Sequence, residues 1–144
     1  MRWVTRRRIR VNRSATAWLV RRFIDPQAMF QFVEPHEVAD VQRTTGAVGF
    51  DAPGARYPHA DECGRCSFEA LVEEHCSGDH ALRRMARIIH CADFPDEIDG
   101  VPEAYGLRAI SRGFPDVSAN DDETVARASF LYDSLYASLT ATSA

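Results

Sequence analysis

Apolar positions recur along the chain at two spacings, which predict helices joined by a few short strands. Runs of β-branched and aromatic residues at Arg2–Thr5, Met29–Val33 and Ala47–Phe50 are typical of strands. Apolar residues three and four positions apart predict helices over Ala15–Ile24, Pro35–Thr45, Ser67–Cys76, His80–Asp93, Pro102–Arg112 and Asp122–Leu139. We therefore expect a mostly helical α+β fold with its few short strands in the N-terminal third.

Short polar residues mark where several of these helices should begin. Asn12 or Ser14 can cap the first helix and Asp79 the helix that starts at His80, because such side chains accept hydrogen bonds from the first free amides. The stretch 51–66 contains two prolines and two glycines and is expected to be a loop. Long loops inside compact domains often carry function.

Length and composition restrict the class of protein. The chain has 144 residues, of which 45% are hydrophobic and 26% charged, which fits a single domain over residues 1–144 with a buried core. Its longest apolar run, Ala17–Val20, is far shorter than the roughly 20 residues of a membrane span. We expect a protein that is not secreted and has no membrane association, with thiols or metal ligands rather than disulfides among its four cysteines.

The formal net charge of −4 conceals an uneven distribution of charge. Residues 1–24 contain eight arginines and no acidic residue, and all 17 basic residues of the chain are arginines. Guanidinium groups pair well with oxyanions through parallel hydrogen bonds. An arginine-rich start is also found in nucleic-acid-binding arms and transit peptides, which remain alternatives.

Charged residues interrupt two of the predicted apolar helix faces. Arg22 falls beside Trp18 and Phe23, where a cation needs a bound anion, a carboxylate or an aromatic surface. Arg22 is therefore either an anion ligand or part of a structural ion pair stacked on Trp18. Asp93 lies on an apolar face with His90 at its edge. Asp93 either sits at a fraying helix end, faces Arg22, or shares a ligand with His90.

The loop and the helix after it contain candidate metal ligands. His59, Cys63, Cys66 and His75 could surround a zinc ion, which prefers thiolate and imidazole ligands in a tetrahedral arrangement. The chain has one Cys-x-x-Cys pair, and His75 shares a helix face with apolar residues, where a buried structural histidine is the alternative. We expect no resident cofactor, with zinc or iron as the alternative.

Cys66 also leaves open whether the protein is an enzyme. It precedes a predicted helix, whose N-terminus lowers the pKa of a thiol, and His59 could activate it as a nucleophile. Glu69, His90 and Asp93 are the further residues that would support metal- or thiol-dependent catalysis.

Motifs spread over nearly the whole chain resemble the C-terminal domain of the chromate resistance protein B family. They are Trp3-Val4-Thr5-Arg6, Asn12-Arg13, Trp18 to Asp25, Phe50-Asp51-x-Pro53-Gly54, His59, Arg65 to Glu69, Leu82 to Asp93 and Leu131 to Tyr136. The chain departs from the family pattern at Asn12, where the family favours aspartate, at Thr16-Ala17, where it favours Cys-Pro, and at the additional Cys63.

The resemblance implies a cytoplasmic domain connected with chromate resistance and, in longer relatives, with chromate-responsive transcription. Chromate is a tetrahedral dianion that guanidinium groups bind well. We expect Arg6, Arg13, Arg22 and His59 to converge on one pocket that binds or senses a small oxyanion such as chromate. We expect no nucleic-acid binding by this chain alone, since its motifs begin at Trp3, and the oligomeric state stays open.

Overall fold

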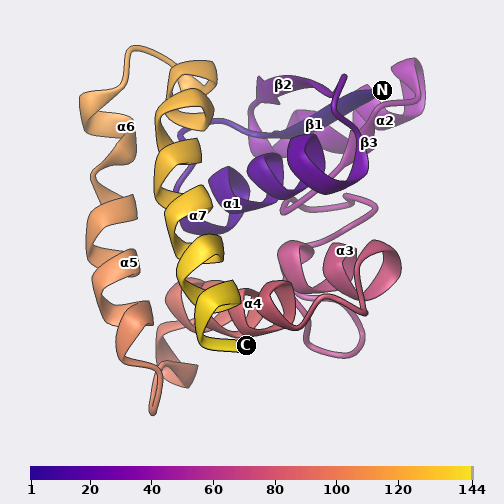
Figure 1. The fold of residues 1–144 in the computed structure, drawn as a ribbon. Coiled ribbons are helices and arrows are strands. Elements are labelled where there is room, and N and C mark those ends of the chain that lie inside the picture. Colours follow the sequence, from indigo (N-terminus) through magenta and orange to yellow (C-terminus); the bar gives the residue numbers. More distant parts are fainter. Residues whose placement is uncertain (144) are drawn as a thin grey trace.

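The computed structural model describes residues 1–143 and combines a small parallel sheet with a larger layer of helices (Figure 1). The elements are β1 (Arg2–Arg6), α1 (Val11–Leu19), β2 (Met29–Val33), α2 (Val38–Thr45), β3 (Val48–Gly49), α3 (Ser67–His75), α4 (His80–Asp93), α5 (Pro102–Arg112), α6 (Phe114–Val117) and α7 (Asp121–Ser143). The predicted α+β class, mostly helical with the strands in the N-terminal third, is confirmed.

The first strand lies at the centre of the sheet. The strand order is β2-β1-β3, and both neighbours run parallel to β1, with Trp3 opposite Phe30 on one side and Val48 on the other. Parallel neighbours need crossover connections, which α1 and α2 supply. The carboxyl ends of β1 and β3 therefore meet at one edge, which brings Arg6 beside the loop that follows β3.

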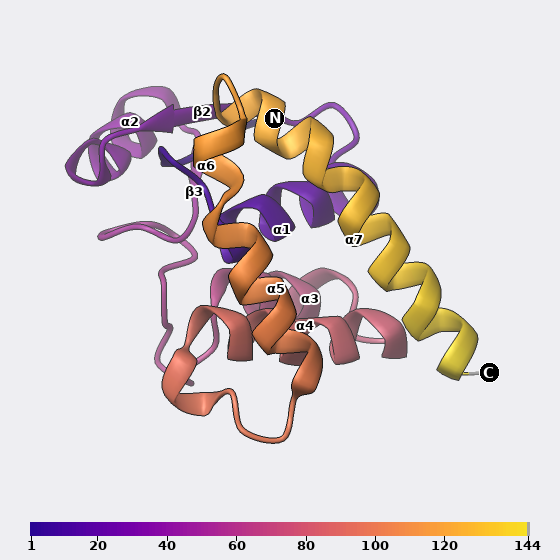
Figure 2. The same ribbon diagram turned by 90° about the vertical axis from the view of Figure 1, so that its left-hand side faces the viewer.

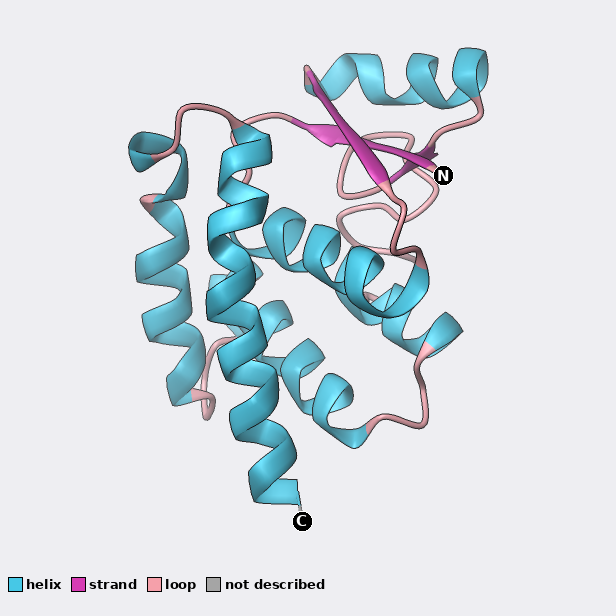
Figure 3. Cartoon of the chain, turned by 45° about the horizontal axis from the view of Figure 1, so that its top comes forward, coloured by secondary structure: helices cyan, strands magenta, loops and turns pink. Residues whose placement is uncertain are grey.

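The helical layer packs around α1, which contacts α3, α4, α5 and α7. Figure 3 shows the sheet and α2 grouped at one end of the molecule, with the other helices below them. Figure 2 shows α7 running from the sheet end to the C-terminus beside α1 and α5. The buried core includes Trp3, Trp18, Phe50, Phe68 and Tyr132.

The last helix is tied to the start of the chain by hydrogen bonds. Asp121, the first residue of α7, accepts from the backbone amides of Arg8 and Ile9 at 3.0 and 2.9 Å. The buried Tyr132 hydroxyl donates to the carbonyl of Val11 at 3.1 Å and lies 2.7 Å from Ser14 Oγ. The turn between β1 and α1 is thus completed by residues more than one hundred positions later.

The predicted start of the first helix is wrong. α1 begins at Val11, so Asn12 and Ser14 lie inside the helix, and neither caps it. Ser14 Oγ instead donates back to the carbonyl of Arg10, and Asn12 Nδ2 donates to Ser67 Oγ at 2.9 Å. These hydrogen bonds occupy the two side chains that we expected to cap the helix. The helix continues past Leu19 as a π-helical turn over Val20–Ile24.

The later helix ends were predicted more closely. Asp79 caps α4 as expected, since its carboxylate accepts from the Leu82 amide at 2.9 Å. Gly46 ends α2 with a left-handed φ of 74°, whereas Gly113 keeps a right-handed helical conformation. The chain therefore continues directly into α6, a helix that the sequence pattern did not predict.

Within residues 1–143, no helix is both long enough and apolar enough to cross a bilayer.

Candidate functional site

A polar cavity of about 270 Å³ lies at the carboxyl edge of the sheet, between the β1–α1 turn and the helices α4 and α5. Five arginines line it, together with two aspartates and four other residues: Arg6, Arg10, Arg13, Arg108, Arg112, Asp51, Asp93, Val11, Asn12, Ala92 and Ser111. The guanidinium groups exceed the carboxylates by three charges. Such an excess of positive charge in a confined space attracts anions.

Asp51 organises one side of this cavity. Its side chain is only 2% exposed, and its φ of 50° is a left-handed conformation that aspartate and asparagine tolerate better than most residues. Arg6 donates from Nε to the Asp51 carbonyl at 2.6 Å and from Nη2 to Oδ1 at 3.3 Å. Arg13 Nε lies 3.5 Å from Oδ2, and His59 Nδ1 lies 2.9 Å from Oδ1.

Arg13 holds the backbone of the β1–α1 turn. Its Nη1 donates to the carbonyls of Arg6 and Arg7 at 3.1 Å each, and its Nη2 to that of Arg8 at 3.4 Å. Burial lowers the pKa of Arg13, and the neighbouring Asp51 carboxylate opposes that shift. Most N–H groups of Arg13 thus donate to the backbone of the turn. Arg13 therefore stabilises the turn that lines the cavity.

The exposed guanidinium groups of the cavity are different. Arg10 and Arg112 are exposed and have no hydrogen-bonding or ion-pair partner for their side chains within residues 1–143. Arg108 donates from Nη1 to the Ala92 carbonyl at 2.9 Å and is half-buried. Sequence reasoning missed these three residues. Their unused donors are available to an anion that enters the cavity.

His59 and Asp93 form a titratable pair beside Asp51. His59 Nδ1 lies 3.4 Å from Asp93 Oδ2, an oxygen that is buried without a hydrogen-bond partner in the described part of the chain. The hydrogen bond to Asp51 raises the pKa of His59. Burial raises the pKa of Asp93 to about 6, and the nearby Asp51 carboxylate adds to the shift. Both pKa values are therefore shifted upward, which favours the protonated form of each group.

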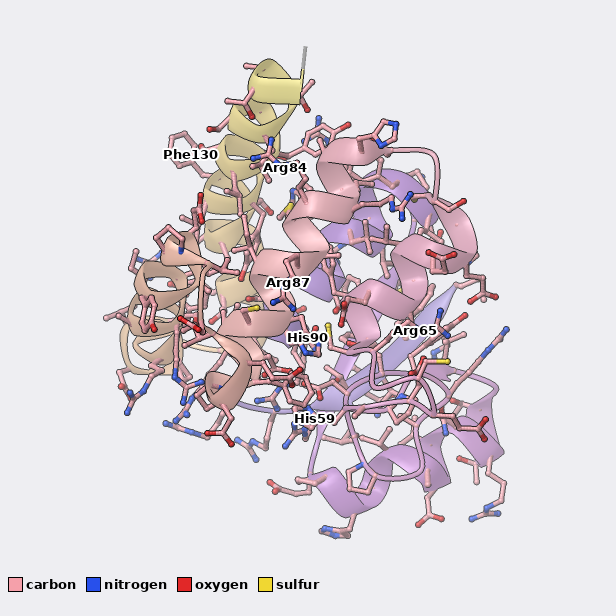
Figure 4. All side chains as sticks on the ribbon, turned by 90° about the horizontal axis from the view of Figure 1, so that it is seen from below. His59, Arg65, Arg84, Arg87, His90 and Phe130 are labelled. Carbon is pink, nitrogen blue, oxygen red and sulfur yellow. The ribbon has the colours of Figure 1, made fainter. Side chains whose placement is uncertain are left out.

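A second cluster lies across the ring of Phe94 from the first. Phe94 stacks on His59 and on His90, with ring centroids 4.6 and 4.5 Å apart. Figure 4 shows both histidines near each other on the underside of the molecule. His90 Nδ1 lies 2.5 Å from Glu69 Oε1, and its Nε2 lies 3.1 Å from Glu97 Oε2. In this cluster two carboxylates lie against one histidine, whereas in the cavity the arginines outnumber the carboxylates.

Of the four predicted anion ligands, Arg6 and Arg13 line the cavity, His59 lies beside it against Asp51, and Arg22 lies elsewhere. Arg22 Nη1 lies 2.7 Å from Asp133 Oδ1, and the guanidinium lies 5.8 Å from the ring centroid of Trp18. The reason is distance along the helix, since nine residues from Arg13 to Arg22 correspond to about 13 Å of rise. Arg22 therefore belongs to a structural ion pair stacked on Trp18, and Asp93 faces His59 instead of Arg22.

The four predicted zinc ligands do not come together. Cys63 is exposed, and His75 is also exposed, beside Glu74 at 3.8 Å, so His75 is not the buried histidine of the alternative interpretation. His59 joins Asp51, whereas Cys66 is buried beside Glu69 and His90. The left-handed turn at Gly64, with φ of 75°, separates the two cysteines of the pair.

The predicted activation of Cys66 by His59 is not supported either. Cys66 is fully buried, and burial raises the pKa of its thiol well above the ordinary value. A nucleophilic cysteine needs the opposite shift and access to its substrate. The histidine near Cys66 is His90.

Comparisons with known proteins agree with the motifs in the sequence. A family described as ChrB, C-terminal domain, matches residues 3–139. Protein ChrB of Cupriavidus metallidurans is 38% identical over 138 residues, which cover 93% of this chain and 39% of that relative. The chain thus spans well under half the length of this relative. No solved structure matches the chain.

Proposed function

Because the chain belongs to the family of ChrB C-terminal domains, we propose that its arginine-lined cavity binds a small oxyanion such as chromate. The observation that carries the proposal is the placement of five guanidinium groups around one polar cavity at the edge of the sheet. A tetrahedral oxyanion presents acceptors in several directions, and charge-assisted hydrogen bonds from separate arginines can satisfy them together. The domain would then act as a cytoplasmic oxyanion sensor.

The arginines of the cavity divide into two roles in this proposal. Arg13, with Asp51, fixes the turn that forms the floor of the cavity. Arg10 and Arg112 supply unpaired guanidinium groups, and Arg6 and Arg108 add donors that their protein contacts leave free. The bound anion thus accepts hydrogen bonds from guanidinium groups that have no other partner, and few hydrogen bonds within the protein need to break.

Replacing Arg10 or Arg112 by alanine will weaken oxyanion binding about tenfold to a hundredfold. One charge-assisted hydrogen bond contributes roughly 1.5–3 kcal/mol, and 1.4 kcal/mol corresponds to a factor of ten. Titration calorimetry with chromate, sulfate and phosphate measures the change. Both side chains are exposed, so neither variant should unfold.

Arg83→Ala is the matched control, because Arg83 is an exposed helical arginine away from the cavity. Arg22→Ala tests the pocket predicted from the sequence, and we expect it to retain full affinity because Arg22 lies against Asp133. Equal affinity in all four variants, or no binding by the natural sequence, would remove the oxyanion proposal.

Sulfate affinity will increase by about tenfold as the pH falls from about 8 to about 5.5. Protonation of His59 adds a positive charge, and protonation of Asp93, whose pKa is raised to about 6, removes a negative one. Both changes favour an anion in the cavity, and sulfate itself stays a dianion across this range. Calorimetry at a series of pH values, with a His59→Gln/Asp93→Asn double variant as control, measures the effect. The affinity of the double variant for sulfate should depend little on pH. If its affinity changed with pH as much as that of the natural sequence, His59 and Asp93 would not be the cause of the pH dependence.

A further inference from the structure

We propose that Cys66, Glu69 and His90 form a binding site for a divalent transition-metal ion of the zinc type. The Cys66 sulfur, a Glu69 carboxylate oxygen and a His90 ring nitrogen all lie within 4.8 Å of one another. Thiolate, carboxylate and imidazole are the three protein ligands that zinc uses. The proposal is independent of oxyanion binding, since none of these residues lines the arginine cavity.

Two packed helices hold the three ligands in place. Cys66 is the residue before α3, and Glu69 lies in the first turn of that helix, where each side chain accepts from the other's backbone amide. His90 lies in the last turn of α4, which packs against α3. Cys66 is fully buried and the His90 side chain is 7% exposed. Ligands on rigid elements keep their geometry without a metal present, which favours binding.

The remaining ring nitrogen of His90 has the partner that metal-bound histidines usually have. His90 Nε2 lies 3.1 Å from Glu97 Oε2. A carboxylate in this position fixes the tautomer, so that Nδ1 is the nitrogen left for the metal, and it strengthens the imidazole as a ligand. Glu97 would thus act as a positioning residue, acting through His90.

Charge also favours a cation at this cluster. The carboxylates of Glu69 and Glu97 both lie against His90, and neither pairs with an arginine in residues 1–143. The other group of possible ligands, Asp51, His59 and Asp93, lies against Arg6 and Arg13, which would repel a metal ion. The Cys66 cluster is therefore the better cation site.

Metal binding at this cluster must release protons. The thiol of Cys66 loses one proton as the metal–sulfur bond forms, and the proton shared by His90 Nδ1 and Glu69 Oε1 leaves as the metal bonds to both. These two atoms, now 2.5 Å apart, must separate to about 3.3 Å, the spacing of neighbouring ligands around tetrahedral zinc. Glu69 is partly exposed and can turn to allow this.

Titration of the full chain with Zn²⁺ and with Co²⁺ tests the proposal. We expect about one equivalent of metal per chain, release of about two protons, and a thiolate-to-cobalt charge-transfer band in the near ultraviolet. Cys66→Ser, which can still cap α3, should abolish that band and weaken Zn²⁺ binding at least a hundredfold. Glu97→Gln should weaken it tenfold to a hundredfold, and because Glu97 is 55% exposed this variant should remain folded.

Cys63→Ser and His75→Gln are the matched controls, because they remove the same side-chain types from positions outside the cluster. Both should bind Zn²⁺ like the natural sequence. Absence of stoichiometric binding by the natural sequence would overturn the proposal. So would loss of binding in Cys63→Ser equal to that in Cys66→Ser, because the metal would then belong to the Cys-x-x-Cys loop.

Discussion

Replacing Asp51 by asparagine will lower the free energy of unfolding by about 3–5 kcal/mol, the usual cost of removing one partner from a buried ion pair. The Asp51 side chain is 2% exposed, and that of Arg13 is 12% exposed. Without the carboxylate, Arg13 keeps its charge in a buried position among other arginines. Asparagine tolerates the left-handed backbone at this position, so the variant tests the charge without adding strain.

Chemical denaturation measures the loss, and Asp40→Asn provides the control. The Asp40 carboxylate also pairs with an arginine, Arg43, but both side chains are more than two-thirds exposed, and such pairs contribute little. Asp51→Asn should also lower the pKa of His59, because the hydrogen bond to Asp51 is the main cause of its raised value. An unfolding free energy like that of Asp40→Asn would show that Asp51 does not hold the cavity together.

Removal of residues 1–24 will abolish cooperative unfolding. These residues form the central strand of the sheet, so β2 and β3 would lose the strand to which both are hydrogen-bonded. They also supply Trp3, Trp18 and Leu19 to the core and α1 to the centre of the helical layer. Circular dichroism during heating of a chain that starts at Asp25 should show a gradual, non-cooperative change.

A chain that ends at Leu139 is the control for this truncation. It removes the exposed Thr140, Ala141 and Thr142 together with the two residues after them, and leaves the core side chains of that helix in place. We expect it to melt cooperatively, close to the full chain. A chain starting at Asp25 that melts as sharply as this control would contradict the central role of β1 and α1.

The elements that could be predicted from the sequence are those whose ends are determined locally. Both ends of α4 and α5 were predicted, because Asp79 caps one helix and Pro102 begins the other. The start of α1 was missed because Ser14 and Asn12, which look like caps, have distant partners. Ser14 lies against Tyr132 and Asn12 against Ser67, and such contacts leave no trace in the local pattern.

The candidate site was predictable only in part, for a similar reason. Arg6 and Arg13 were identified because they lie in the arginine-rich segment 1–24, which has no acidic residue. His59 was identified because it lies in the long loop 51–66. Asp51 was overlooked as a site residue, although an acidic residue just after a predicted strand is a signal, since ligands bind at the carboxyl ends of parallel strands. Arg108 and Arg112 had no such signal, because only the packing of α5 brings them to the cavity.

The hydrogen bonds from Arg8 and Ile9 to Asp121 have a consequence for synthesis on the ribosome. β1 and α1 leave the ribosome before α7, so the buried Ile9 has no partner for its amide until α7 has begun to emerge. A buried amide without a partner costs about 1–3 kcal/mol, so the turn that forms the cavity floor stays incomplete until then. The nascent chain therefore acquires its arginine cavity only after Asp121 has left the ribosome, and a product that stops before Asp121 would lack it.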